Sequence, residues 1–346
     1  MAPRRKTGNV TLKDIARETG FSANTVSRAL ADKPDISQET KDVIRQTASR
    51  MGYIANALAS FLRSGVSRNI AIIVGDIANP HFSVMVKEMQ TTLQKKGYNS
   101  IIFNSEEKAA QEKQAITIAL SQNVDGILIC PAPGGEENIR FLEEHGKPFV
   151  MLGRHFGRKD ASFVVCDDVH GGYAATRYLL GYGHRKILFL NGPKGISSSA
   201  QRLEGYCQAL AEAGIPYRSE LVHSVPVTGE ESGEKIKKIL MERKDCTAVL
   251  VFNDILAWQT VCILKELGRA VPGACSVAGF DNIKYPYPMR LTSVSSSKTT
   301  MAKRSVEILL RKLEGRAKTE ECVVLETEVV EGETVVEAKL KAKSLC

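Results

Sequence analysis

The 346-residue sequence lacks several features that define large classes of proteins. No run of about 18 apolar residues is present that would cross a bilayer. The basic first residues are followed by polar Thr7, Gly8 and Asn9, where an export signal would have an apolar core. Eight cysteines form no CxxC pair or regular spacing, which favours reduced thiols over a disulfide framework or a zinc site. We therefore expect a cytoplasmic protein with no membrane partner.

Catalytic signatures are also missing. The sequence contains no GxGxxG, GxxxxGK(S/T), GxSxG or HExxH motif, and its six histidines include no pair at metal-ligand spacing. Cys166, Asp167 and His170 lie close enough in sequence to suggest a metal site or a thiol nucleophile, but a surface loop is the better interpretation. We predict no catalytic residue, metal or cofactor, and therefore no enzyme.

The positive charge of the chain is concentrated at one end. Residues 1–68 contain twelve Lys and Arg against six Asp and Glu, a net charge of +6 out of +8 for the whole chain. A small basic module is therefore joined to a long, nearly neutral body that is large enough for more than one core. Such an asymmetry suggests an anionic polymer as the partner of the module.

Residues 1–53 are expected to form three short helices. Thr11 caps the first, with Asp14 placed to complete a capping box, and Ser22 caps the second after a very short joint. The third begins near Ser37, and its periodicity predicts four buried side chains: Val43, Ile44, Ala48 and Met51.

The second helix has a polar face formed by Ala23, Asn24, Ser27 and Arg28, because residues three to five apart cluster on a helix surface. Asn and Arg suit bidentate contacts with adenine and guanine in the major groove. Together with the basic excess, this face predicts a DNA-binding helix-turn-helix domain.

The stretches TLKDIARETGFSANTVSRAL, GYIANALASFLRSG and NIAIIVGDIANPHF resemble the lac/gal repressor family of transcription regulators, and the resemblance covers essentially the whole chain. It implies that operator bases are read by Ala23, Asn24 and Arg28. It also implies phosphate contacts, which fall on three hydroxyl residues: Thr11, Ser22 and Thr25. Ala31 departs from the Asn that is frequent at its position.

Residues 54–68 form the linker, which the resemblance implies is a hinge helix that forms when a homodimer sits on DNA. The family pattern places a leucine that inserts into the minor groove at Leu62, with Asn56 and Ala59 as further DNA contacts. Phe61 stands where a small residue is common, and it either belongs to the wedge or packs against the other hinge. In the alternative interpretation, Phe61 and Leu62 cover an edge of the core.

From residue 69 to 346, short β-rich runs alternate with amphipathic stretches, which predicts parallel α/β sheets. A break in this rhythm at 153–166 indicates two halves. The resemblance implies a periplasmic-binding-protein-like core of two doubly wound subdomains, with crossovers near 166–170 and 291–298. An effector cleft is expected between the subdomains.

Residues that follow strands, matched motif to motif with the family, are the predicted effector-binding set: His81, Phe82, Arg154, Arg202, Asn253, Asp254 and Asp281. Arg, Asn and Asp suit sugar hydroxyls, which both donate and accept hydrogen bonds. Gly153 replaces a frequent Asp and Lys298 replaces a frequent aromatic residue. Together with His81, Arg154 and His155, these two replacements predict a positively charged cleft. One option for the ligand is therefore a sugar acid or a phosphorylated compound.

These patterns predict a ligand-responsive, sequence-specific regulator that represses carbohydrate-related genes, with operator DNA, a sugar or sugar derivative and a second copy of the chain as partners. The alternative is a sugar-binding protein or an enzyme on the same α/β body. The sequence does not identify the effector or the operator. It also does not decide whether the effector weakens or strengthens DNA binding, or whether the protein is a dimer or a tetramer.

Overall fold

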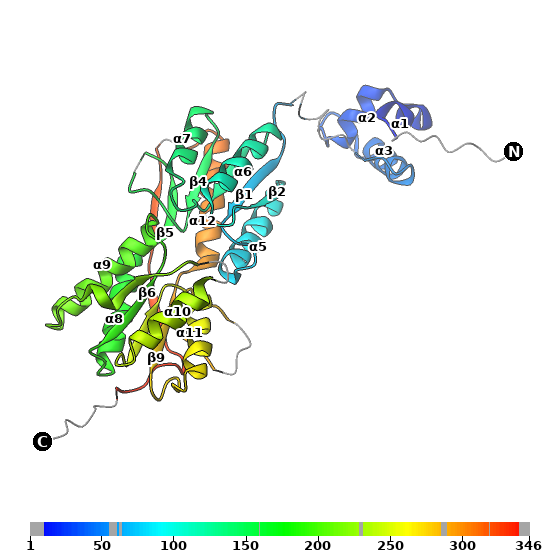
Figure 1. Ribbon diagram of the computed structural model, residues 1–346. Coiled ribbons are helices and arrows are strands. Elements are labelled where there is room, and N and C mark those ends of the chain that lie inside the picture. Colours follow the sequence, from blue (N-terminus) through cyan, green and yellow to red (C-terminus); the bar gives the residue numbers. More distant parts are fainter. Residues whose placement is uncertain are drawn as a thin grey trace, which may run out of the picture. The chain divides into compact units, whose positions relative to one another are not determined.

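The computed structural model describes residues 10–54, 61, 64–158, 160–227, 231–284, 289–317 and 319–338. The chain divides into two compact units, Met1–Ser67 and Arg68–Cys346. Over the described residues, none of the helices is both long and apolar enough to cross a membrane. Figure 1 labels many of the elements of each unit.

The first unit contains three helices, α1 (Leu12–Thr19), α2 (Ala23–Leu30) and α3 (Gln38–Arg50). The predicted caps are confirmed. Thr11 and Asp14 form a reciprocal capping box, and the Ser22 hydroxyl accepts a hydrogen bond from the Thr25 amide at 3.0 Å. Gly20 ends α1 with φ of 75°, a left-handed conformation that favours glycine. These local signals fix the tight joint between α1 and α2.

The core of this unit is small. Its fully or nearly fully buried apolar residues are Ile15, Val26, Ala29, Ile44 and Ala48. The prediction that Val43 is buried is wrong, because its side chain is 45% exposed. The buried face of α3 runs through Ile44, Thr47 and Ala48, and Val43 points away from it. Lys41 is buried instead, and its ammonium pairs with Asp32 at 3.1 Å.

The second unit contains two six-stranded sheets. The order in the first sheet is β11 (Cys322–Leu325), β5 (Phe163–Cys166), β4 (Phe149–Leu152), β3 (Gly126–Ile129), β1 (Asn69–Val74) and β2 (Asn99–Asn104). The order in the second is β12 (Glu328–Val330), β10 (Thr292–Ser295), β9 (Ser276–Phe280), β8 (Ala248–Val251), β6 (Ile187–Asn191) and β7 (Val222–Ser224). All pairings are parallel except that of β12 with β10. Strands covered on both faces explain the nearly continuous apolar runs.

Helices cover both faces of each sheet (Figure 1). Those of the first subdomain are α5 (Pro80–Lys95), α6 (Ala109–Ser121), α7 (Glu136–Glu144) and α12 (Lys298–Leu313). Those of the second are α8 (Asp168–Gly181), α9 (Ser197–Glu212), α10 (Glu231–Glu242) and α11 (Asp254–Glu266), with a short 3-10 turn, η1 (Ser219–Leu221). In the first, α5 and α12 share a core on one face while α6 and α7 cover the other. The predicted class, a small all-α domain plus two doubly wound subdomains, is confirmed.

The chain passes between the subdomains three times, from β5 to α8, from β10 to α12, and from β11 to β12. The expected break at 153–166 contains a strand, since Phe163–Cys166 is β5 and is buried throughout. The carboxyl-terminal segment contributes β11 to the first sheet and β10 and β12 to the second. These short crossovers bring the carboxyl ends of both sets of parallel strands toward one another.

Candidate DNA interface and effector cavity

The predicted recognition face of α2 is directed outward within its own unit. Ala23, Asn24 and Arg28 are exposed, whereas Val26 and Ala29 on the opposite face are buried in the three-helix core. The helix therefore offers a short apolar residue, an amide and a guanidinium on one accessible surface. That combination can read base edges by hydrogen bonds in the major groove.

The hydroxyl residues of the DNA-binding prediction lie around the amino ends of α1 and α2. Thr11 and Ser22 are exposed caps, and the Ser22 and Thr25 hydroxyls are 2.8 Å apart. Ser27 is half-buried. Free backbone amides at a helix amino end favour phosphate. Three further predicted contacts lie outside the described residues: Asn56, Ala59 and Leu62.

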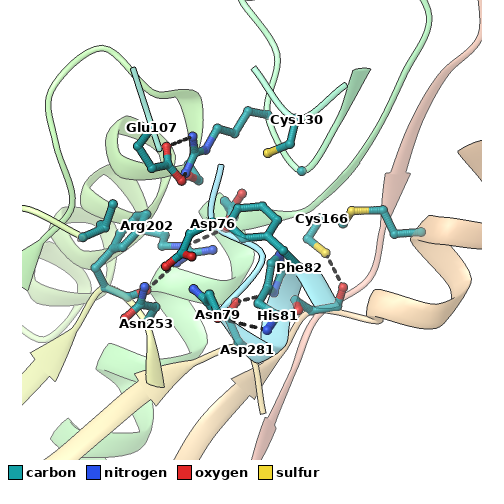
Figure 2. A pocket seen from close by; sticks show the side chains of 18 residues that line it. Asp76, Asn79, His81, Phe82, Glu107, Cys130, Cys166, Arg202, Asn253 and Asp281 are labelled. Carbon is teal, nitrogen blue, oxygen red and sulfur yellow. Dashed lines mark hydrogen bonds and ion pairs between the residues drawn. The ribbon is translucent and has the colours of Figure 1, made fainter. Parts of the chain in front are cut away.

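A cavity of about 60 Å³ lies between the two subdomains of the second unit. It is lined at the carboxyl ends of β1 to β5 and of β8 to β10, where side chains from both sheets converge (Figure 2). Of the seven predicted effector residues, six line this cavity: His81, Phe82, Arg154, Arg202, Asn253 and Asp281. The space holds only a few water molecules. A larger ligand therefore enters only when the paired side chains around it move apart.

One contact between an imidazole and a carboxylate bridges the two subdomains across the cavity. His81, in the first turn of α5, places Nδ1 3.1 Å from Oδ1 of Asp281, which follows β9 (Figure 2); Asp281 is buried and His81 is partly buried. Burial alone would raise the pKa of Asp281, but His81, Arg202 and Lys298 outweigh it and lower the pKa to about 2. Asp281 therefore stays charged. Its backbone φ is 102°, a conformation that few residues other than glycine adopt.

Arg202 is held in a fixed plane on the second subdomain. Its Nε donates to Asp168 at 2.7 Å, and Nη1 donates to the carbonyl oxygen of Phe252. The guanidinium also lies over two aromatic rings, 4.6 Å from the centroid of Phe252 and 4.1 Å from that of Phe280. These cation–π contacts add to the hydrogen bonds that fix its position.

Arg154 has a similar arrangement on the first subdomain. It donates to Glu107 through Nη1 at 2.5 Å and Nη2 at 3.0 Å, and to the Pro131 carbonyl oxygen. Burial alone would lower the pKa of Arg154, but the charge of Glu107 raises it. Behind this pair, burial raises the pKa of Glu112 to about 6 despite hydrogen bonds that include one from Asn138. A layer of polar groups thus supports the cavity wall.

Asn253 and Asp254 follow β8 together, but only Asn253 lines the cavity. Asp254 accepts hydrogen bonds from the Ser293 hydroxyl at 2.6 Å and from the Ile283 amide at 2.7 Å. Its burial and the neighbouring charge of Asp281 raise the pKa of Asp254 well above its usual value. Asp254 ties β10 to the loop after β9, so its prediction as an effector-binding residue is corrected.

The predicted cationic character of the cleft is also wrong. Four carboxylates line the cavity: Asp76, Glu107, Asp168 and Asp281. They face two guanidinium groups and one imidazole. His155 stacks on Phe163 at 4.6 Å, and Lys298 donates to the Asp281 carbonyl oxygen, so neither belongs to the lining. The paired charges are suited to a neutral polar ligand.

Three carboxylates of this lining are missing from the predicted set. Asp76 follows β1, Glu107 follows β2 and Asp168 follows β5. The same rule that selected His81, a polar residue soon after a strand, would have found Asp76 and Glu107. Predicting Asp168 would have required recognition of β5, the strand that it follows. One further wall is apolar and polarisable and contains Phe82, Cys130, Cys166 and Met301.

Cys166, Asp167 and His170 form no catalytic group. Burial raises the pKa of Cys166 to about 12, so it remains a thiol, and its sulfur donates to the Ser296 carbonyl oxygen at 2.8 Å. Asp167 caps α8, and His170 Nδ1 is 3.0 Å from the Thr327 hydroxyl. The expected surface loop is in fact a strand end and a helix cap. Among the described residues, no three His, Cys, Asp or Glu side chains are grouped to hold a metal ion.

The chain matches two known protein families. Residues 67–321 match the family described as periplasmic binding proteins and sugar binding domain of LacI family. Residues 11–56 match the bacterial regulatory proteins of the lacI family. The chain belongs to the LacI family of DNA-binding transcription regulators, with a helix-turn-helix and an effector-binding core. These proteins are regulators and not enzymes, so the enzyme alternative falls away.

Individual relatives cover nearly the whole chain. The transcriptional regulator GalR of Escherichia coli is 30% identical over 336 residues, which are 96% of this chain and 97% of that protein. The lac repressor dimer bound to operator and the anti-inducer ONPF is similar in structure, with a TM-score of 0.83, 23% identity, and coverage of 95% of this chain and 100% of that chain. A LacI family regulator from Enterococcus faecium with bound ribose has a TM-score of 0.69 and 26% identity over 78% of this chain and 100% of that chain.

Proposed function

We propose that this protein represses genes by binding an operator with α2 in the major groove. Ala23, Asn24 and Arg28 read bases, with Ser27 on the same face. Phosphate contacts come from Thr11, Ser22 and Thr25 at the amino ends of α1 and α2. The exposed polar face of α2 carries this half of the proposal, and the similarity to a lac repressor bound to operator supports it. Such a regulator works in the cytoplasm, where the chromosome lies.

The linker completes the DNA contact in this proposal. Residues 54–68 act as a hinge, and Leu62 inserts between base pairs of the minor groove, flanked by contacts from Asn56 and Ala59. Unstacking a base step costs a few kcal/mol, which the contacts made by a kinked duplex offset.

The effector in this proposal is a neutral sugar, and the matched charges of the cavity are the observation that carries it. Each basic side chain that lines the cavity has a carboxylate partner: His81 lies against Asp281, Arg154 pairs with Glu107 and Arg202 pairs with Asp168. An added phosphate or carboxylate would find both guanidinium groups already paired and would meet a fourth carboxylate, that of Asp76, whereas hydroxyl groups can both donate to carboxylates and accept from guanidiniums. The Enterococcus faecium relative with bound ribose is consistent with this class.

Binding would act through the relative orientation of the two subdomains. The contact of His81 with Asp281 favours the closed form of the two subdomains. A ligand that replaces this contact shifts the equilibrium only by the difference between its affinities for the closed and the open form. Allosteric coupling of this kind is typically about 1–3 kcal/mol.

The protein is proposed to act as a homodimer, as the similar lac repressor does on its operator. β2 is an edge strand of the first sheet, and α5 packs beside it. Ile102 on β2 and Val84 on α5 are 40% and 39% exposed, which is high for large apolar side chains beside an open sheet edge.

A thermal-shift screen of neutral sugars, sugar acids and sugar phosphates tests the effector half. A neutral pentose or hexose at about 100 times its Kd should stabilise the core by about 2.7 kcal/mol, because it binds only the folded state. Sugar acids and sugar phosphates should give no shift. A response confined to the anionic compounds would contradict the neutral-ligand assignment.

Arg28→Ala tests the DNA half. The substitution should cost roughly 1–3 kcal/mol in operator binding and relax specificity at one base pair, because one bidentate base contact is lost. Binding of the sugar should be unchanged, since it concerns the other unit. Equal losses on operator and on random DNA, measured by fluorescence anisotropy, would show that Arg28 contacts a phosphate.

A further inference from the structure

Arg28, the guanidinium of the recognition face, is paired with a carboxylate of the turn between α2 and α3. Its Nε donates to Asp35 Oδ2 at 2.8 Å, and its Nη2 lies 2.6 Å from Asp35 Oδ1. Both side chains are nearly half exposed, at 43% and 48%. A surface ion pair of this kind adds little to stability. Its effect is therefore on where the guanidinium points.

The pairing uses only one edge of the guanidinium. Arginine has five N–H donors in a planar fork, and Asp35 occupies the side-on edge, formed by Nε and one N–H of Nη2. Among the residues that the structure describes, none bonds to the end-on edge, formed by Nη1 and the second N–H of Nη2. That edge has two parallel donors, the number that O6 and N7 of guanine accept.

Asp35 is itself held in place. The Lys33 amide donates to the Arg28 carbonyl oxygen at 3.1 Å, and the Ile36 amide donates to the Lys33 carbonyl oxygen at 3.3 Å. Pro34 fixes the backbone before Asp35, and Ile36 after it packs against the three-helix core. The hydrogen bond from Arg28 lowers the pKa of Asp35, so the carboxylate remains charged.

We infer that Asp35 is a positioning residue for base recognition: it holds the guanidinium of Arg28 side-on so that its end-on edge is presented to a guanine in the major groove. This inference rests on the proposed role of Arg28 in reading DNA. Asp35 also brings a negative charge close to the DNA. It therefore lowers the affinity for DNA of any sequence while it raises the selectivity for guanine at the position that Arg28 reads.

The opposite signs of these two effects provide the test. Asp35→Asn removes the charge but preserves the size of the side chain, so binding to random duplex DNA should be equal or tighter. Selectivity for guanine at the position read by Arg28 should fall roughly fivefold, because a bidentate contact that is no longer oriented discriminates less. Asp35→Glu preserves the charge and displaces the guanidinium, so it should lower selectivity without tighter binding to random DNA.

The experiment uses the full-length protein and a randomised duplex library, and base preferences are compared among wild type, Asp35→Asn, Asp35→Glu and Arg28→Ala. Asp42→Asn is the matched control, because it removes one carboxylate from α3 that pairs with Gln38 and not with Arg28. The control should retain the full guanine preference. Circular dichroism melting establishes that each variant is folded.

The outcomes separate this inference from the proposed function. If Arg28→Ala changes the preference at no position, base reading by Arg28 is wrong and this inference falls with it. If Arg28→Ala abolishes a guanine preference that both Asp35 variants retain, only the role of Asp35 is wrong. Equal loss of affinity for all sequences together with a lower Tm would show that Asp35 serves the fold alone.

Discussion

Gly205→Ala should destabilise the second unit by roughly 3 kcal/mol or more, the upper range for inserting a methyl group into packed structure. Gly205 on α9 meets the backbone of α8 so closely that a Cβ would overlap the Val169 carbonyl oxygen and the Tyr173 amide. Gly172 on α8 reciprocally faces the backbone of Arg202. Main-chain atoms on both sides cannot move aside, so the two helices must separate.

Separation of α8 and α9 should also remove the effector site, because Asp168 and Arg202 lie on these two helices and their 2.7 Å hydrogen bond joins them. We expect Tm to fall by roughly 5–10 °C and the sugar-induced shift to disappear. Gly181→Ala is the control, since Gly181 lies at the end of α8 with no atom near its Cβ position. It should be neutral or slightly stabilising. Similar melting curves for both variants would show that α8 and α9 are not packed this closely.

Much of the fold follows from local sequence signals. Thr11, Ser22 and Ser37 each cap the helix expected after them, and runs such as Ile70–Val74 are buried strands. These signals are local because a cap involves residues only three apart and a strand is a continuous apolar run. The signal for β5 is weak, because the strand is only four residues long and lies within a stretch rich in charged and small residues.

The site is less accessible to prediction because it depends on partners far apart in the sequence. The rule that polar residues after strands line a cleft selects both Asn253 and Asp254, yet successive residues at a helix start point in different directions, and only Asn253 faces the cavity. The charge of the cleft is hard to predict for a related reason. The sequence identifies Arg154 as a candidate but does not show that Glu107, 47 residues earlier, is its partner. In the structure, Arg154 Nη1 lies 2.5 Å from Glu107 Oε2, so the carboxylate neutralises the guanidinium.

Asp281→Asn should abolish the effect of the sugar on the protein, with affinity falling at least about 100-fold, the loss expected when one partner of a buried charged pair is removed. Asn is the informative replacement, because it fits the same space and tolerates the φ of 102° better than Ala. His81 would lose the carboxylate that its Nδ1 contacts, whereas Arg202 keeps its hydrogen bonds to Asp168 and to the Phe252 carbonyl oxygen. The Lys298 ammonium bonds to the main chain of residue 281, so that contact survives the substitution.

The control for this variant is Asp245→Asn, which removes a carboxylate of the same subdomain that pairs with Lys186 and does not line the cavity. It should leave the sugar-induced shift unchanged. Isothermal titration of the sugar and operator binding with and without it give the decisive readouts: Asp281→Asn should still bind operator, but the sugar should no longer change that affinity. If Asp281→Asn binds the sugar as tightly as wild type, the effector does not occupy the cavity between the subdomains, because Asp281 lines that cavity and contacts His81 of the other subdomain across it.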